Sequence, residues 1–230
     1  MTDGDTQDTL VTCFFDGPPV SARSAGGNPQ PLGAEVSADR LSLRIGDGRV
    51  TLLNGDIVTV GRNRACDIVP PTANGEDQDE RKRRLKVSRR HCELCRTPAG
   101  WILRDGVADS SGRRSLSSFG TWWNGVAVHD AFPLSAPAGI LSLGGPSVAD
   151  SIAFDVRLCG QSLTLTARNA SGVAYVLLDG HADLSSVAPS LDRLVAAWEN
   201  GHFVWSRGTK RGVFVPGTAV TVGSGQVWVE

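Results

Sequence analysis

Short apolar stretches separated by turn-forming residues dominate the chain from Leu41 onwards. Residues 41–45, 49–53 and 57–60 are rich in Leu, Ile and Val, and the segments between them contain Asp-Gly and Asn-Gly pairs. Such pairs tolerate the positive φ that tight hairpin turns require. Similar short stretches follow at residues 66–69, 91–96, 101–105, 121–123, 140–143 and 152–158. Many short strands with turns between them are typical of a β-sandwich or barrel, so this part of the chain is predicted to be mainly β.

The pattern changes after Gly160. Residues 163–167 and 173–178 are expected to form strands, and Ser190 stands where it would cap a helix that ends at Gly201. The apolar face of that helix would consist of Leu191, Leu194, Val195 and Trp198. Further strands are predicted at residues 203–205, 213–215, 220–222 and 227–229. This part of the chain is therefore predicted to be a small α+β domain of unknown role.

The composition of the chain divides it into three parts. The first 36 residues begin with Thr and Asp and continue with many Gly and Pro residues, which predicts a flexible N-terminal tail. Residues 37–159 are predicted to form the β domain, and residues 160–230 the small α+β domain.

The charge and the cysteine content exclude several classes of protein. The formal net charge of −1 is unlike that of general nucleic-acid binders, which carry a large positive excess. The acidic start is the reverse of a secretory signal peptide, and the apolar run at residues 10–15 is far too short to cross a membrane. The five cysteines are an odd number and widely scattered, which favours free thiols in a reducing compartment. The chain is expected to be cytoplasmic, with no membrane or nucleic-acid partner.

Three polar clusters stand at the edges of predicted strands. They are Gly61-Arg62, Ser88-Arg89-Arg90-His91, and Ser118-Phe119-Gly120-Thr121 followed by Asn124-Gly125. The guanidinium of Arg62 offers paired donors that match phosphate oxygens, and it cannot lose its charge. Ser88 and Ser118 add hydroxyl donors from two other loops, and charge-assisted hydrogen bonds of this kind contribute roughly 1.5–3 kcal/mol each. The clusters therefore predict a pocket that binds a phosphorylated group, with no catalytic residue in it.

The order of these clusters, each beside a strand, is similar to that of the forkhead-associated (FHA) domain, a phosphothreonine-binding module. The resemblance covers about residues 41–159 and implies a β-sandwich that binds phosphothreonine peptides through loops at one end. It also implies that Arg62 and Ser88 bind the phosphate and that Ser118 helps to hold the phosphothreonine. Structural support of the site is expected from Gly61, His91, Thr121, Asn124 and Gly125.

One position departs from the family pattern. The family usually has Asn directly before the Gly-Thr pair, where it bonds the peptide backbone, and this chain has Phe119. Arg89, Phe119 and Gly120 are expected to contact the peptide, but without that asparagine.

The densest positive charge of the chain lies just before the second cluster. It comprises Arg81, Lys82, Arg83 and Arg84, which follow four acidic residues. The ordinary interpretation is a solvated loop. The functional hypothesis is an auxiliary basic loop that attracts acidic residues flanking the phosphate.

Other chemistry is weaker in the sequence. Cys92 and Cys95 are three residues apart in a predicted strand, so their thiols should face opposite sides and bind no metal together. Asp179, His181 and Asp183 are expected to form a turn, with Asp183 available as a cap. No metal and no cofactor are predicted.

The chain is therefore predicted to be a non-catalytic signalling adaptor that binds a phosphothreonine-containing protein. The resemblance implies a Ser/Thr kinase and a phosphatase that act on that partner. Two alternatives stay open: a scaffold that keeps the fold but ignores phosphate, and a hydrolase formed around Asp179, His181 and Asp183. A further hypothesis is that Thr2, Thr6 or Thr9, which lie among aspartates, becomes phosphorylated and occupies the chain's own pocket.

Overall fold

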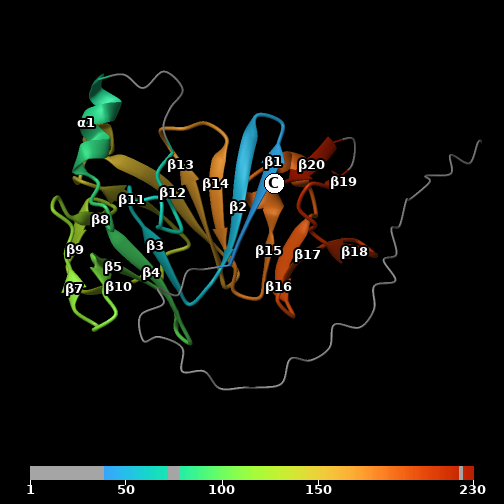
Figure 1. Ribbon diagram of the computed structural model, residues 1–230, viewed down its shortest axis with the longest axis horizontal. Coiled ribbons are helices and arrows are strands. Elements are labelled where there is room, and N and C mark those ends of the chain that lie inside the picture. Colours follow the sequence, from blue (N-terminus) through green and yellow to red (C-terminus); the bar gives the residue numbers. More distant parts are fainter. Residues whose placement is uncertain (1–38, 72–77, 223–224) are drawn as a thin grey trace, which may run out of the picture. The chain divides into compact units, whose positions relative to one another are not determined.

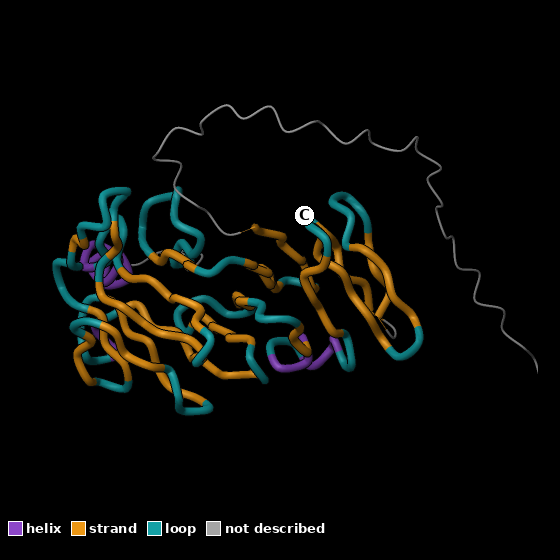
Figure 2. Tube along the Cα trace, turned by 90° about the horizontal axis from the view of Figure 1, so that it is seen from below, coloured by secondary structure: helices purple, strands orange, loops and turns teal. Residues whose placement is uncertain are grey.

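The computed structural model describes residues 39–71, 78–222 and 225–230, and strands make up most of them (Figure 1). The tail predicted at residues 1–36, with its threonines and Cys13, lies outside the described residues. Helical segments are short and few, as the purple parts of the trace in Figure 2 show. No helix among the described residues is long and apolar enough to cross a membrane.

The largest element is a ten-stranded sheet with the order β19-β20-β1-β2-β14-β13-β12-β11-β8-β9. Its strands are β1 (Asp39–Ile45), β2 (Gly48–Asn54), β8 (Thr121–Trp123), β9 (Val126–Val128), β11 (Ala138–Leu143), β12 (Ile152–Cys159), β13 (Ser162–Ala167), β14 (Val173–Leu177), β19 (Ala219–Val222) and β20 (Gly225–Val229). Neighbouring strands are antiparallel, apart from the parallel pair formed by β2 and β14. The mainly β prediction is confirmed.

A four-stranded sheet packs against part of one face of this large sheet and completes a sandwich. Its strands, in the order β10-β5-β4-β3, are β3 (Ile57–Val60), β4 (Cys92–Thr97), β5 (Gly100–Asp105) and β10 (Ala131–Pro133). The first hydrophobic core lies between the two sheets, where Trp101, Leu141 and Phe154 are almost completely buried. This sandwich is the framework that holds the site loops.

A second hydrophobic core lies on the opposite face of the large sheet, against β15 (His181–Asp183), β16 (Val195–Glu199), β17 (His202–Arg207) and β18 (Lys210–Val213). Successive side chains of a strand point to opposite faces, so β2 contributes to both cores. Val50 and Leu52 belong to the second core, and Leu53 belongs to the first. The large sheet thus continues across the predicted domain boundary at residue 160, because β13 and β14 are inserted between β12 and β2.

The helix predicted from Ser190 is wrong. That segment contains a short 3-10 turn, η3 (Pro189–Leu191), and then β16, and the C-terminal part has two 3-10 turns, η2 (Leu184–Ser186) and η3, but no α-helix among its described residues. Arg193 has a positive φ of 58°, which breaks a helix at this point. Trp198 packs across the hairpin on Phe203, with ring centroids 4.6 Å apart. The spacing of the apolar residues fits a helical face, but cross-strand packing decides the structure.

Two polar segments that interrupt the strands, residues 78–87 and 106–117, differ in structure. The first contains the only α-helix of the described residues, α1 (Gln78–Lys86), so its basic run is helical, whereas the sequence pattern predicts a loop. Its Glu80 is buried and accepts a hydrogen bond from the Asn169 side chain at 2.7 Å. The second insertion forms a small two-stranded sheet from β6 (Val107–Ala108) and β7 (Arg114–Ser115).

Candidate functional site

The three clusters seen in the sequence meet at one end of the sandwich. The Arg62 backbone N–H donates to the Ser88 carbonyl at 3.1 Å, which joins the loop after β3 to the loop before β4. The Ser118 backbone N–H donates to the Ser88 Oγ at 3.0 Å, which joins the third loop to the second. Ser88 is therefore the point at which all three loops connect.

This contact also orients the Ser88 hydroxyl. Because its oxygen accepts from Ser118, its own proton remains available to donate to an incoming anion. The Arg62 side chain is exposed and makes no hydrogen bond or ion pair with any described residue. Arg89 and Ser118 are exposed beside it. The end of the sandwich thus offers a guanidinium and hydroxyl donors to solvent, as an anion site requires.

Gly61 allows the first two loops to approach this closely. A Cβ atom at this position would lie 2.4 Å from the Arg89 carbonyl oxygen and 3.0 Å from the Arg90 Cα. Both neighbours belong to the backbone, which cannot move aside without shifting the loop that carries Ser88.

His91 connects the second loop to the third from inside the fold. Its side chain is fully buried, and its Nδ1 accepts from the Ser88 N–H at 2.9 Å. The other ring nitrogen therefore carries the proton, and it donates to the Gly120 carbonyl at 3.0 Å. Desolvation lowers the pKa of His91, more than the Gly120 carbonyl and Asp105 raise it.

This environment predicts a loss of stability in mild acid. The pKa of His91 is lower in the folded state than in the unfolded chain, so the unfolded state binds more protons. The stabilisation that neutral His91 provides is complete above about pH 6.5, the unfolded pKa, and is lost as the pH falls below it. Urea unfolding at pH 7.5 and pH 5 should show a smaller acid loss for His91→Gln than for the wild type. An equal loss in both proteins would contradict the assignment.

Asp105 fixes the third loop and was missed by the sequence analysis. Its buried carboxylate accepts hydrogen bonds from the Ser117 hydroxyl at 2.6 Å, the Ser117 N–H at 3.2 Å and the buried Thr121 hydroxyl. These bonds hold both ends of the segment that contains Ser118. An aspartate at the end of a strand gives no signal in the sequence, because its partners are defined only by the tertiary structure.

The remaining support residues shape two turns. Gly120 has a φ of +78°, and its carbonyl accepts from the Gly144 N–H as well as from His91. Asn124 and Gly125 both have positive φ, at 48° and 79°, as the tight turn between β8 and β9 requires. The Asn124 side chain accepts from the Ile140 N–H at 2.7 Å, so the turn is fixed to β11.

Phe119 is exposed at the centre of the third loop. Its side chain keeps 54% of its surface accessible, and its carbonyl accepts from the Trp122 Nε1 at 3.3 Å. Leu116 on the same loop is 67% exposed. The site thus carries apolar surface beside its polar donors, where the family pattern would place an amide.

The basic run on α1 is partly used by the fold. Lys82 pairs with Asp79 at 2.9 Å, and Arg83 pairs with the buried Glu80 at the same distance. Arg83 also donates to the Ala149 carbonyl. Arg81 is exposed, whereas Arg84 lines a small depression together with Arg62, Pro70 and Val87. Of these four residues, Arg84 is therefore the one that the structure places beside Arg62.

Most of the residues considered for other chemistry are buried or have partners within the fold. Cys92 and Cys95 are buried free thiols, and burial raises the pKa of both. Asp179 pairs with Arg96 at 3.4 Å, and Asp183 caps η2 by accepting from the Ser185 N–H. Among the described residues, no group of three His, Cys, Asp or Glu side chains is placed to hold a metal.

Comparison with known proteins gives one matching family and several similar structures. The sequence model of the FHA domain matches residues 58–139. The FHA-1 domain of Mycobacterium tuberculosis Rv1747 is 21% identical, and the match covers 52% of this chain and 95% of that one with a TM-score of 0.30. The FHA-2 domain of the same ABC transporter is also 21% identical, with 69% and 100% covered and a TM-score of 0.31. The Slr1951 protein of Synechocystis sp. is 24% identical, with 48% and 90% covered and a TM-score of 0.28. No curated protein matches the chain.

Proposed function

We propose that this chain, which carries an FHA domain matched at residues 58–139, binds a threonine-phosphorylated segment of another protein. Arg62 and Ser88 bind the phosphate, and Ser118 assists. The observation that supports this most is the junction at Ser88, where one residue bonds to both the Arg62 backbone and the Ser118 backbone. Residues from three separate loops are thereby held around one exposed guanidinium.

The expected affinity is moderate. Two or three charge-assisted hydrogen bonds of roughly 1.5–3 kcal/mol each must offset the freedom that the partner loses on binding. Contacts from Arg89, Phe119 and Gly120 to the residues around the phosphothreonine would supply the remainder. Because the Phe119 side chain has no amide group, it would contribute an apolar contact where the family usually has a hydrogen bond.

The proposed cellular role is that of a non-catalytic, cytoplasmic adaptor whose partner is phosphorylated by a Ser/Thr kinase and dephosphorylated by a phosphatase. Its second contact would lie in the C-terminal sheet formed by β15 to β18. One alternative has an observation in its favour: the exposed Phe119 and Leu116 would also suit an apolar partner that binds without phosphate.

A degenerate phosphothreonine peptide library tests the proposal. Binding of the full chain to immobilised library should be strong for phosphorylated peptides and should fall to background after phosphatase treatment of the same beads. The unphosphorylated library is the matched control. Equal binding before and after phosphatase treatment would favour the phosphate-independent scaffold and contradict the proposal.

A further inference from the structure

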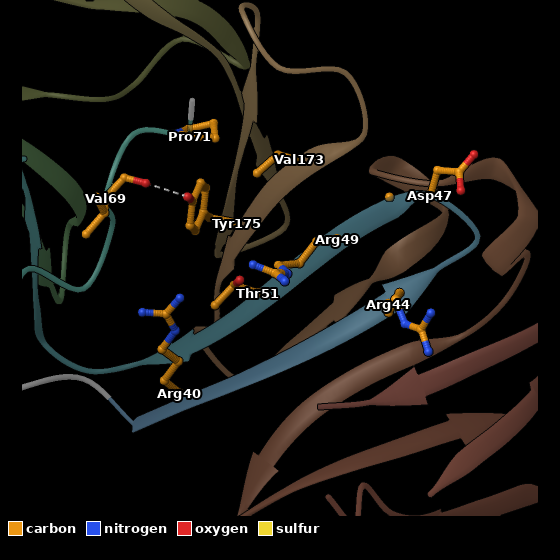
Figure 3. A pocket seen from close by; sticks show the side chains of 10 residues that line it. Arg40, Arg44, Asp47, Arg49, Thr51, Val69, Pro71, Val173 and Tyr175 are labelled. Atoms are coloured by element: carbon orange, nitrogen blue, oxygen red, sulfur yellow. Dashed lines mark hydrogen bonds between the residues drawn. The ribbon is translucent and has the colours of Figure 1, made fainter. Parts of the chain in front are cut away.

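A basic groove lies on the large sheet, outside the three site loops. It has a volume of about 350 Å³ and lies over β1, β2 and β14 (Figure 3). Arg40 and Arg49 approach it from two neighbouring strands. In Figure 3 the Thr51 side chain lies between them, and Tyr175 lies to one side, next to Val69. Its far wall is the segment that contains Val69 and Pro71.

The strand register explains why polar groups gather here. Thr51 is paired with Ser42 on one side and with Tyr175 on the other, so the three side chains form a row on one face of the sheet. On the same face of β2, Leu53 belongs to the first core. The neighbouring strand β1 contributes no residue to that core. The covering sheet therefore leaves this end of the face open, and arginines occupy it.

Two of the arginines that line the groove contact a carboxylate of the chain. The Glu230 side chain lies 3.2 Å from the Arg49 Nε and 3.6 Å from the Arg44 Nε, and all three side chains are substantially exposed. Arg40 has no carboxylate partner among the described residues. Asp47 also borders the groove, but it lies at the turn between β1 and β2, away from Arg40 in Figure 3.

The inner surface of the groove is formed by neutral groups. The Tyr175 hydroxyl donates to the Val69 carbonyl at 2.9 Å, and the Thr51 hydroxyl is 3.5 Å from that of Ser42. Burial raises the pKa of Tyr175, and the nearby charges of Arg40 and Arg49 act in the opposite direction. Both arginines line the same groove as Tyr175.

The groove and the phosphate site share one wall. Val69 and Pro71 line the groove, whereas Pro70, between them, lines the depression that contains Arg62 and Arg84. Consecutive Cα atoms are about 3.8 Å apart, so neighbouring residues of a single segment border the two depressions. An extended peptide advances roughly 3.3–3.6 Å per residue and would cross this wall within a few residues.

We propose that the groove around Arg40 and Arg49 is a second anion-binding subsite, which binds acidic side chains a few residues away from the phosphothreonine of the same partner. This inference rests on the proposed function of the Arg62 site. It places the preference for acidic flanking residues on β1 and β2, and it assigns Glu230 as an internal competitor for Arg49.

Three phosphothreonine peptides test this subsite by titration calorimetry with the full chain. One carries four glutamates before the phosphothreonine, one carries them after it, and one carries glutamines in both places. One of the two acidic peptides should bind roughly three- to tenfold more tightly than the glutamine peptide, as expected for two partly exposed ion pairs. The gain should shrink as salt is raised.

Variants with opposite expected effects make the test specific. Arg40→Gln combined with Arg49→Gln should remove the gain and leave the affinity for the glutamine peptide unchanged. Glu230→Gln should increase the gain, because it removes the competing carboxylate. Arg157→Gln, which removes one positive charge at an exposed position of β12 outside the groove, should leave it intact.

Different results would contradict this inference and the proposed function. Equal affinities of wild type for all three phosphopeptides would overturn the subsite while leaving phosphate binding in place. Equal binding of phosphorylated and unphosphorylated glutamine peptides would instead contradict the proposed function. A gain that survives in the Arg40, Arg49 double variant would also overturn the subsite and would direct attention to Arg81 and Arg84.

Discussion

Replacement of Arg62 by alanine should abolish phosphate-dependent binding. The loss should be at least about 2 kcal/mol, or roughly thirtyfold in affinity, because the phosphate would be desolvated without its charged partner. Stability should not change, since the Arg62 side chain is exposed and bonds to no described residue. Fluorescence anisotropy with a selected phosphothreonine peptide measures the first effect, and thermal unfolding measures the second.

Two further variants define what the arginine contributes. Arg62→Lys keeps the charge but loses the planar pair of donors, so it should recover only part of the affinity. Arg64→Ala removes an exposed arginine two residues away and is the matched control, with little expected effect. A full loss in Arg64→Ala, or full binding in Arg62→Ala, would show that the phosphate binds elsewhere.

Replacement of Gly61 by alanine should damage both stability and binding. The added Cβ would lie 2.4 Å from the Arg89 carbonyl oxygen, so the backbone of the second loop must shift. Overpacking of this kind typically costs about 1–3 kcal/mol of the free energy of unfolding. The shift would also move Ser88 away from Arg62, so the affinity for phosphopeptide should fall even at temperatures at which the variant is folded.

Gly145→Ala is the control for that experiment. A Cβ atom added at Gly145 would have no neighbour within 4 Å, and this residue has no positive φ, so alanine there meets neither a clash nor backbone strain. Urea unfolding together with anisotropy on both variants separates the effects. A Gly61→Ala protein with wild-type stability and affinity would show that the two loops do not need this close approach.

The three clusters of the candidate site can be picked out in the sequence because each is a short motif and because their order is similar to that of the FHA domain. A glycine and an arginine at the end of a strand, a serine three residues before a histidine, and an Asn-Gly turn are each fixed by short-range geometry. Asn124 and Gly125 both have the positive φ that such a turn requires. Asp105 could not be found in the same way, because its three donors come from residues that are distant until the third loop folds back.

The C-terminal part shows the limit of pattern analysis. Leu191, Leu194 and Trp198 have helical spacing, but Leu191 and Leu194 lie in turns, and Trp198 lies in a strand that packs on Phe203. Short apolar segments are compatible with either structure, and tertiary contacts decide between them. The helix at residues 78–86 was missed for the opposite reason, because its only buried residue is the charged Glu80.

By itself, the sequence determined the β-rich class, the three site clusters and the residues that their turns require, since strand alternation and turn chemistry act over a few positions. Only the tertiary structure decided how β13 and β14 enter the large sheet, which partners hold Asp105 and Glu80, and that Arg40 and Arg49 line the same groove. Those arrangements depend on strands that are distant in the chain becoming neighbours. These arrangements are stabilised by apolar burial and by pairing between distant strands. A short stretch of sequence does not contain both partners of such contacts.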